Sequence, residues 1–123
     1  MGARVRISRS EFEEAVDDAL DSLPEEIAEA IARSNVVILV EEEPDPSHHG
    51  TELLGLYEGI PLDHRSVFDG YAQPDRILIF RGPLQRVSAS REELVEQIAV
   101  TVLHELGHLF GLSDERLHEL GWG

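Results

Sequence analysis

The chain has 123 residues, 41% of them hydrophobic and 28% charged, and a chain of this length is expected to form one domain over residues 1–123 with one hydrophobic core. Twenty-five acidic residues against ten basic ones give a net charge of −15, which argues against nucleic acid and anionic membranes as partners. The chain has no cysteine, so disulfides and thiolate ligands are excluded, and a metal ion would have to be bound by histidine and carboxylate side chains.

The first segment of the chain, residues 1–7, lacks the apolar run and the small-residue cleavage site of a secretory signal. No later stretch is apolar for long enough to cross a bilayer. We therefore expect a cytoplasmic protein without a membrane span. The sequence leaves the oligomeric state open.

Two amphipathic helices are predicted in the first third of the chain. Ser10 and Glu13 match a capping box, and the apolar residues that follow repeat with helical spacing, which predicts a helix over about residues 11–21. Pro24 restarts this pattern, and a second helix is expected to end at Asn35.

Three strands are predicted in the middle of the chain. Residues 36–40 form a continuous aliphatic run that is apolar on both faces, which is typical of a central strand. Residues 53–59 contain glycines and have polar flanks, so they indicate a weaker edge strand. Residues 76–80 form the third strand, and the glycine and proline at 82–83 are expected to break the chain after it.

Two polar loops, residues 41–50 and 61–75, separate these strands. The second is rich in Asp, Pro and Gly, and loops of its length in compact domains are often functional. The loops contain three histidines that we interpret as solvated side chains without a metal role: His48, His49 and His64.

The last long helix is predicted to begin at Ser90, which forms a capping box with Glu93, and to end at Gly111. It contains the sequence HELGH at residues 104–108. Two histidines four residues apart on a helix project about 40° from each other, so both imidazoles can reach one ion. The residues expected to anchor the opposite side of the helix in the core are Val95, Ala99, Val102, Leu106 and Phe110.

His104 and His108 are therefore candidate ligands of a metal ion, for which zinc is the expected identity. Glu105 would point beside this ion, where it could take a proton from water and pass it to a leaving amine. The alternative is that these are solvated residues that match the motif by chance, but a capped and strongly apolar helix favours a site. Tyr57 and Tyr71 could donate a hydrogen bond to an oxyanion or serve only in packing.

A catalytic zinc ion usually has three protein ligands, so a third must be found. Gly111 can turn the chain out of the helix, and Asp114 three residues later completes the pattern HExxHxxGxxD. Asp114 is the preferred third ligand. Alternatively, Ser113 or Asp114 only caps a short helix over residues 115–120. The other candidate ligands are then Glu115, His118 and Glu119.

The chain resembles a family of small bacterial proteins over nearly all of its length from Phe12 onward. The resemblance lies in the segments LGLYEGIPL at residues 54–62, PDRI at 74–77 and VLHELGHLFGLSDERL at 102–117. The chain is similar in these segments to the minimal zincin-like metallopeptidase domains, once classed as a domain of unknown function.

This resemblance implies an α+β fold in which a small mixed β-sheet is backed by helices, with the active-site helix beneath it. It implies His104, His108 and Asp114 as zinc ligands and Glu105 as the catalytic base. We therefore expect a zinc metallopeptidase whose peptide or protein substrate lies along the edge strand at residues 53–59. Two alternatives stay open: a non-catalytic metal-binding or interaction module, and a metal hydrolase of a non-peptide amide. Aspartate is a hard ligand, so manganese or cobalt is conceivable beside zinc.

Overall fold

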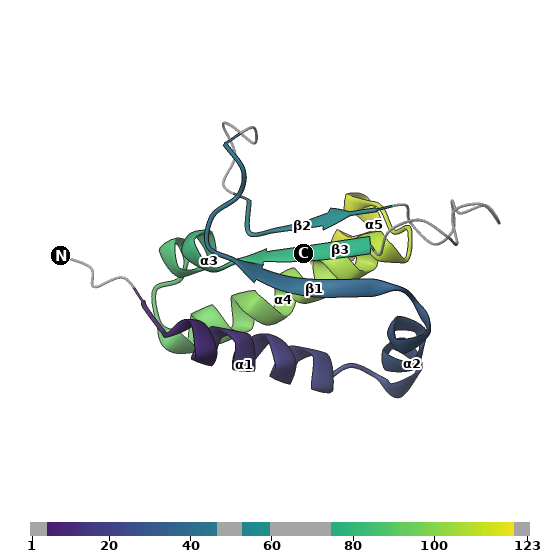
Figure 1. Cartoon of the computed structure of the whole chain (residues 1–123), viewed down its shortest axis with the longest axis horizontal. Coiled ribbons are helices and arrows are strands. Elements are labelled where there is room, and N and C mark those ends of the chain that lie inside the picture. The colour runs from purple at the N-terminus through teal and green to yellow at the C-terminus, as the bar shows by residue number, and fades with distance from the viewer. Residues whose placement is uncertain (1–4, 47–52, 60–74, 120–123) are drawn as a thin grey trace.

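The computed structural model describes residues 5–46, 53–59 and 75–119. Over these residues the fold is α+β, as expected, with helices packed against a small mixed sheet (Figure 1). The elements in chain order are α1 (Arg9–Asp21), α2 (Glu25–Arg33), β1 (Val36–Glu41), β2 (Gly55–Glu58), β3 (Asp75–Phe80), α3 (Arg81–Val87), α4 (Arg91–Leu109) and α5 (Asp114–Glu119). A search of the helices in these ranges found none with the length and hydropathy to cross a membrane.

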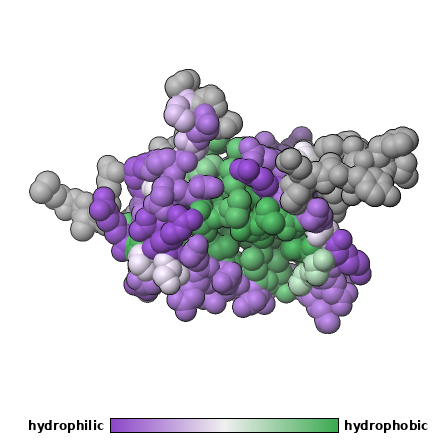
Figure 2. Space-filling model, viewed as in Figure 1, coloured by the Kyte–Doolittle hydropathy of each residue, from purple (hydrophilic) through white to green (hydrophobic). Residues whose placement is uncertain are grey.

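The sheet has the strand order β1-β3-β2, so β3 is its central strand. β1 runs parallel to β3, and β2 runs antiparallel to it. The prediction that residues 36–40 form the central strand is therefore wrong, whereas the edge position expected for residues 53–59 is confirmed for β2. On β1, Val37 and Leu39 are 40% and 39% exposed. Figure 2 shows apolar residues gathered in the middle of this view, around β1, with polar residues along α1.

The sheet and helices share one core because alternate strand residues point to the same face. Ile77 and Ile79 of β3 are fully buried and belong to the same cluster as residues of α1 and α4. α4 packs against β2, β3, α1 and α3, so it joins the sheet to α1 and α3. The helix that carries the HELGH sequence is thus also the most extensively packed helix of the fold.

The core side of α4 differs from the expected one. Val102 and Leu106 are buried as predicted, but Val95 is 45% exposed. Leu94 and Ile98 are fully buried instead. Apolar residues lie on several sides of this helix, so sequence periodicity could not distinguish the side that packs on the sheet from the others.

α1 begins earlier than expected, with Ser8 as its N-cap, and the Ser8 side chain accepts a hydrogen bond from the backbone N–H of Glu11 at 3.1 Å. Ser8 with Glu11 and Ser10 with Glu13 both match a capping box. The earlier start places an apolar residue before the cap and another at the fourth helical position, which is the arrangement of a hydrophobic staple. The two residues are Ile7 and Phe12, and both are buried. Their burial explains why the helix starts at this earlier position.

α3 is a helix that the sequence analysis missed, because the glycine and proline at 82–83 were interpreted as a break. Pro83 lies in the first turn of α3, where a backbone N–H has no helical partner and its absence costs nothing. Pro83 and Leu84 are buried. Tertiary packing of this short segment therefore outweighs its weak helix propensity.

Candidate metal centre

The HELGH sequence occupies the last two turns of α4. Ser90 caps the N-terminus of the helix as predicted, since its side chain accepts a hydrogen bond from the backbone N–H of Glu93 at 3.1 Å. The side chains of His104 and His108 are 28% and 29% exposed, so both are accessible from one side. Their rings are 4.8 Å apart between centroids, which places both imidazoles on the same face of the helix.

α4 ends in a turn that reverses the chain toward the two histidines. Gly111 has a φ of 82°, a left-handed conformation that glycine adopts without the strain that a Cβ would bring. The backbone N–H of Gly111 donates to the carbonyl of His108 at 3.0 Å, and that of Leu112 donates to the carbonyl of Gly107 at 2.9 Å. This pair of bonds is the Schellman motif, and it confirms the helix end expected at Gly111.

Asp114 is the first residue of α5, and this turn carries it back to the histidines. Its Oδ1 atom lies 3.3 Å from Nε2 of His104 and 3.1 Å from Nε2 of His108. The two Nε2 atoms are 3.2 Å apart. The structure thus brings together the three residues that the sequence analysis selected.

The alternative role for this segment, capping of α5, is filled by Ser113. Its hydroxyl accepts a hydrogen bond from the backbone N–H of Arg116 at 3.1 Å. Asp114 is therefore not needed as the cap, and its carboxylate is 82% exposed beside the histidines. In the described part of the chain, the group of ligand atoms does not include the other candidate ligands, Glu115, His118 and Glu119.

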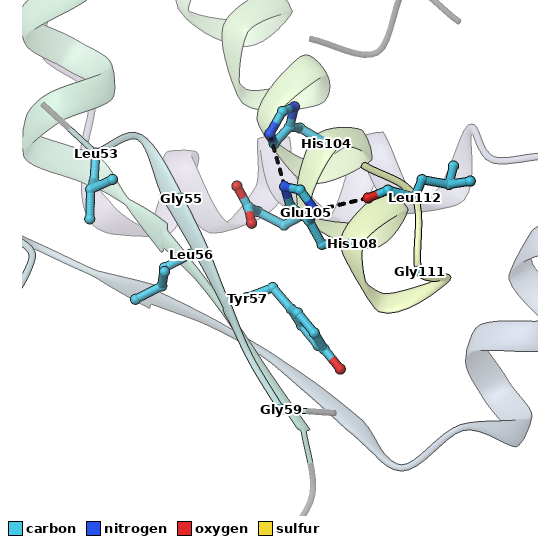
Figure 3. A pocket seen from close by; sticks show the side chains of 10 residues that line it. All are labelled: Leu53, Gly55, Leu56, Tyr57, Gly59, His104, Glu105, His108, Gly111 and Leu112. Carbon is cyan, nitrogen blue, oxygen red and sulfur yellow. Dashed lines mark hydrogen bonds between the residues drawn. The ribbon is translucent and has the colours of Figure 1, made fainter. Parts of the chain in front are cut away.

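The spacing of these three atoms fits a tetrahedral zinc site. Zinc bonds to histidine nitrogen and carboxylate oxygen are about 2.0–2.2 Å long, so neighbouring ligand atoms of a tetrahedron lie about 3.3–3.6 Å apart. The three separations of 3.1–3.3 Å are close to this value. In addition, Nδ1 of His108 is 3.1 Å from the carbonyl oxygen of Leu112 (Figure 3). If Nδ1–H donates a hydrogen bond to that oxygen, the lone pair of Nε2 is free to bind a metal ion held between the three ligand atoms.

Glu105 lies beside this group, on the side of α4 that faces β2 (Figure 3). Its side chain is largely buried, and the residue is only 7% exposed. The pKa of Glu105 is raised, mainly by burial and in smaller part by the nearby Asp114 carboxylate. His104, His108 and a backbone hydrogen bond from Tyr57 lower this pKa but do not outweigh the burial. The carboxylate therefore sits in a partly dehydrated position next to the converging ligand atoms.

A cleft of about 580 Å³ opens beside the edge strand β2 and the end of α4. Its lining residues come from these two elements and the turn after α4: Leu53, Gly55, Leu56, Tyr57, Gly59, His104, Glu105, His108, Gly111 and Leu112. The Tyr57 hydroxyl lies 3.0 Å from an Asp75 carboxylate oxygen and donates to it, which favours the packing role for this tyrosine over an oxyanion role. Gly55 and Leu112 were not expected at the site, although a glycine inside a strand is itself a signal of close backbone approach.

Several earlier expectations fall on residues 47–52 and 60–74, outside the part that the structure describes. They concern the proposed functional loop up to residue 74, Tyr71, and the histidines assigned no metal role: His48, His49 and His64.

Gly55 allows β2 to approach α4 closely. A Cβ atom at this position would lie 2.7 Å from Cγ2 of Thr101 and 3.1 Å from both Cγ of Glu105 and the backbone oxygen of Leu78. We expect Gly55→Ala to lower the free energy of unfolding by about 1–3 kcal/mol, as overpacking of a core does. Urea unfolding followed by circular dichroism measures this change.

Thr101→Ser provides the matched control for this prediction. It removes the methyl group that the new Cβ would meet and keeps the hydroxyl, which donates to the carbonyl of Gln97 at 2.7 Å. In the double variant with Gly55→Ala, part of the lost stability should return, with a coupling energy of at least about 0.5 kcal/mol. Strictly additive effects would contradict the assigned contact.

The fold and the cluster together define a domain of zincin type. The model of the zincin-like metallopeptidase family matches residues 33–122, and the chain therefore belongs to this family. Among solved structures, it is similar to a conserved hypothetical protein from T. thermophilus, with 24% identity and a TM-score of 0.56. That match covers 93% of this chain and 97% of the other, and at this identity it supports the fold alone. The comparison with curated proteins found no match.

Proposed function

We propose that the protein is a zinc-dependent metallopeptidase in which His104, His108 and Asp114 bind zinc and Glu105 acts as the general base. The observation that carries this proposal is the meeting of three ligand atoms close to tetrahedral spacing, two of them from histidines that line an open cleft. Structural zinc sites use four protein ligands, whereas catalytic sites use three and leave a position for water. A cytoplasmic location is also part of this proposal.

The substrate proposed for this cleft is an extended peptide. β2 is paired with β3 along one edge only in the described sheet, so its other edge can pair with a peptide backbone by strand addition. Such a peptide would cross the cleft between β2 and α4 and pass the cluster of ligand atoms.

The proposed reaction is hydrolysis of a peptide bond by water. Zinc, when bound, supplies a Lewis acid that activates water and polarises a carbonyl group. Glu105 takes a proton from the attacking water and passes it to the nitrogen of the leaving amine. Its burial beside the cleft restricts the positions that the carboxylate can take, which suits repeated proton transfer.

The rival proposal is a metal-binding or interaction module without turnover. The placement of Glu105 favours the enzyme, because a structural metal site gains nothing from a buried carboxylate beside its ligands, and burial of that group is costly. A hydrolase of a non-peptide amide would use the same residues and is distinguished only by its substrate.

Metal analysis followed by digestion of a peptide library tests the proposal. We expect about one zinc per chain. Cleavage should be lost with a chelator and restored by added zinc. One bound zinc without cleavage of any library peptide would favour the non-catalytic module. Cleavage of simple amides in place of peptides would favour a metal hydrolase of a non-peptide amide.

The role proposed for Asp114 predicts a difference between two substitutions. Asp114→Ala removes the third ligand and should weaken zinc binding by at least about tenfold, judged by competition with a chromophoric chelator. Asp114→His supplies another zinc ligand from the same turn and should keep binding close to that of the parent. Glu115→Ala, one residue further along α5, is the matched control. An Asp114→Ala protein that binds zinc as tightly as the Glu115→Ala control would overturn the assignment.

A further inference from the structure

α4 has a third side that neither the core nor the candidate metal centre uses. Together with α1 and α2 it encloses an apolar groove of about 360 Å³. A helix turns about 100° per residue, so the α4 residues that line the groove lie on average about 160° around the helix axis from His104 and His108. The groove is lined mainly by Ala19, Leu23, Ile27, Val95, Ala99 and Leu103. A molecule bound there would leave the cleft at β2 free.

α2 leaves this groove partly uncovered. It is strongly amphipathic in sequence, with three apolar residues on one side, yet none of its residues is buried. Ile27, Ala30 and Ile31 are only half-buried. On the opposite wall, Val95 is 45% exposed and is among the large hydrophobic residues exposed in the described part of the chain. Apolar surface of this kind, gathered in a concave site, is a mark of interaction sites.

The border of the groove carries negative charge that is not neutralised. Asp18 lines the groove, and on α4 helical spacing places Glu92 and Glu96 on the same side as Val95 and Ala99. Within the described ranges the three carboxylates make no ion pair and are exposed: Asp18, Glu92 and Glu96. With a net charge of −15, a second copy of the chain would be repelled from this surface.

We propose that this groove binds a basic amphipathic helix of a partner protein. The apolar side of that helix would fill the groove, and its Lys and Arg side chains would pair with the three carboxylates on the border. Residues 95–103 span about 12 Å along α4, which matches apolar anchors at positions i, i+4 and i+7 of the bound helix. The proposal concerns a site separate from the cleft and does not depend on peptidase activity.

The probe for this proposal is a fluorescein-labelled 18-residue peptide of leucine and lysine, with leucine at i, i+3, i+4 and i+7 spacing. Fluorescence anisotropy at physiological salt measures its Kd, beside a scrambled peptide of the same composition. Val95→Gln is expected to raise the Kd at least about fivefold, since it places an amide in an apolar contact. Glu92→Gln with Glu96→Gln should raise it by a similar factor and reduce its salt dependence.

The charge-matched control is Glu41→Gln with Glu115→Gln, on two exposed residues outside the groove. This variant should change the Kd by less than about twofold at physiological salt. If the scrambled peptide bound as tightly as the amphipathic one, or if the control variant weakened binding as much as Glu92→Gln with Glu96→Gln, general electrostatic attraction would explain the binding. Either result would overturn the proposal. Self-association that Val95→Gln abolishes would identify a second copy as the occupant and also overturn it. Thermal unfolding of each variant verifies that the fold is retained.

Discussion

Replacing Glu105 with glutamine is expected to reduce kcat/KM for peptide hydrolysis at least about 100-fold while the zinc content stays at that of the parent. Glutamine has nearly the same shape as glutamate, so it fits this largely buried position. Its amide cannot accept a proton at neutral pH, so water would not be deprotonated. Glu105 is not one of the three proposed ligands, which is why the metal should remain.

The measurement is a comparison of turnover and zinc content for the parent, Glu105→Gln and Glu41→Gln. The last variant loses one exposed carboxylate on β1 and should behave as the parent. Equal turnover by the parent and Glu105→Gln would refute the general-base assignment. Loss of zinc in Glu105→Gln would instead show that this carboxylate takes part in binding the metal.

Replacing His104 and His108 together with alanine is expected to abolish stoichiometric zinc binding, to below about 0.1 zinc per chain after dialysis. The two imidazoles supply two of the three ligand atoms, and Asp114 alone, with an 82% exposed side chain, competes poorly with water for the ion. Elemental analysis measures the metal content. Since zinc bound to the folded state raises the thermal midpoint, added zinc should stabilise the parent but not the double variant.

His118→Ala is the matched control for this prediction. His118 is exposed on α5 and does not belong to the cluster of ligand atoms in the described residues. It should keep one zinc per chain and the thermal shift. If the double variant retained stoichiometric zinc, the metal would have to be bound elsewhere, and the proposed centre would be wrong.

The local parts of the site were predictable because helix geometry determines them. His104 and His108 lie four residues apart, so any regular helix places them on one face. Gly111 lies within one turn of His108, and three further residues span at most about 10 Å. Asp114 therefore has to lie close to the two histidines. The Schellman turn and the cluster follow from this short segment.

Other features depended on contacts between distant segments. Residues 36–40 and 77–80 are both apolar runs, and only the pairing of their strands shows that the second belongs to the central strand. Likewise, Ser8 and Ser10 offered equivalent caps for α1, and the burial of Ile7 against the rest of the fold explains the earlier start.

By itself, the sequence determined most of the helices and strands, the helix that carries the two histidines, and the turn that presents Asp114, because each depends on periodicity or spacing within about 20 residues. The α+β class followed from the resemblance to a known family. Only the tertiary structure decided that β2 lies against α4 with Gly55 between them, that Glu105 is buried beside this strand, and that Val95 faces away from the core. The physical reason is that burial is a property of packed pairs of elements. A residue's own segment specifies the direction of its side chain but not the element that covers it.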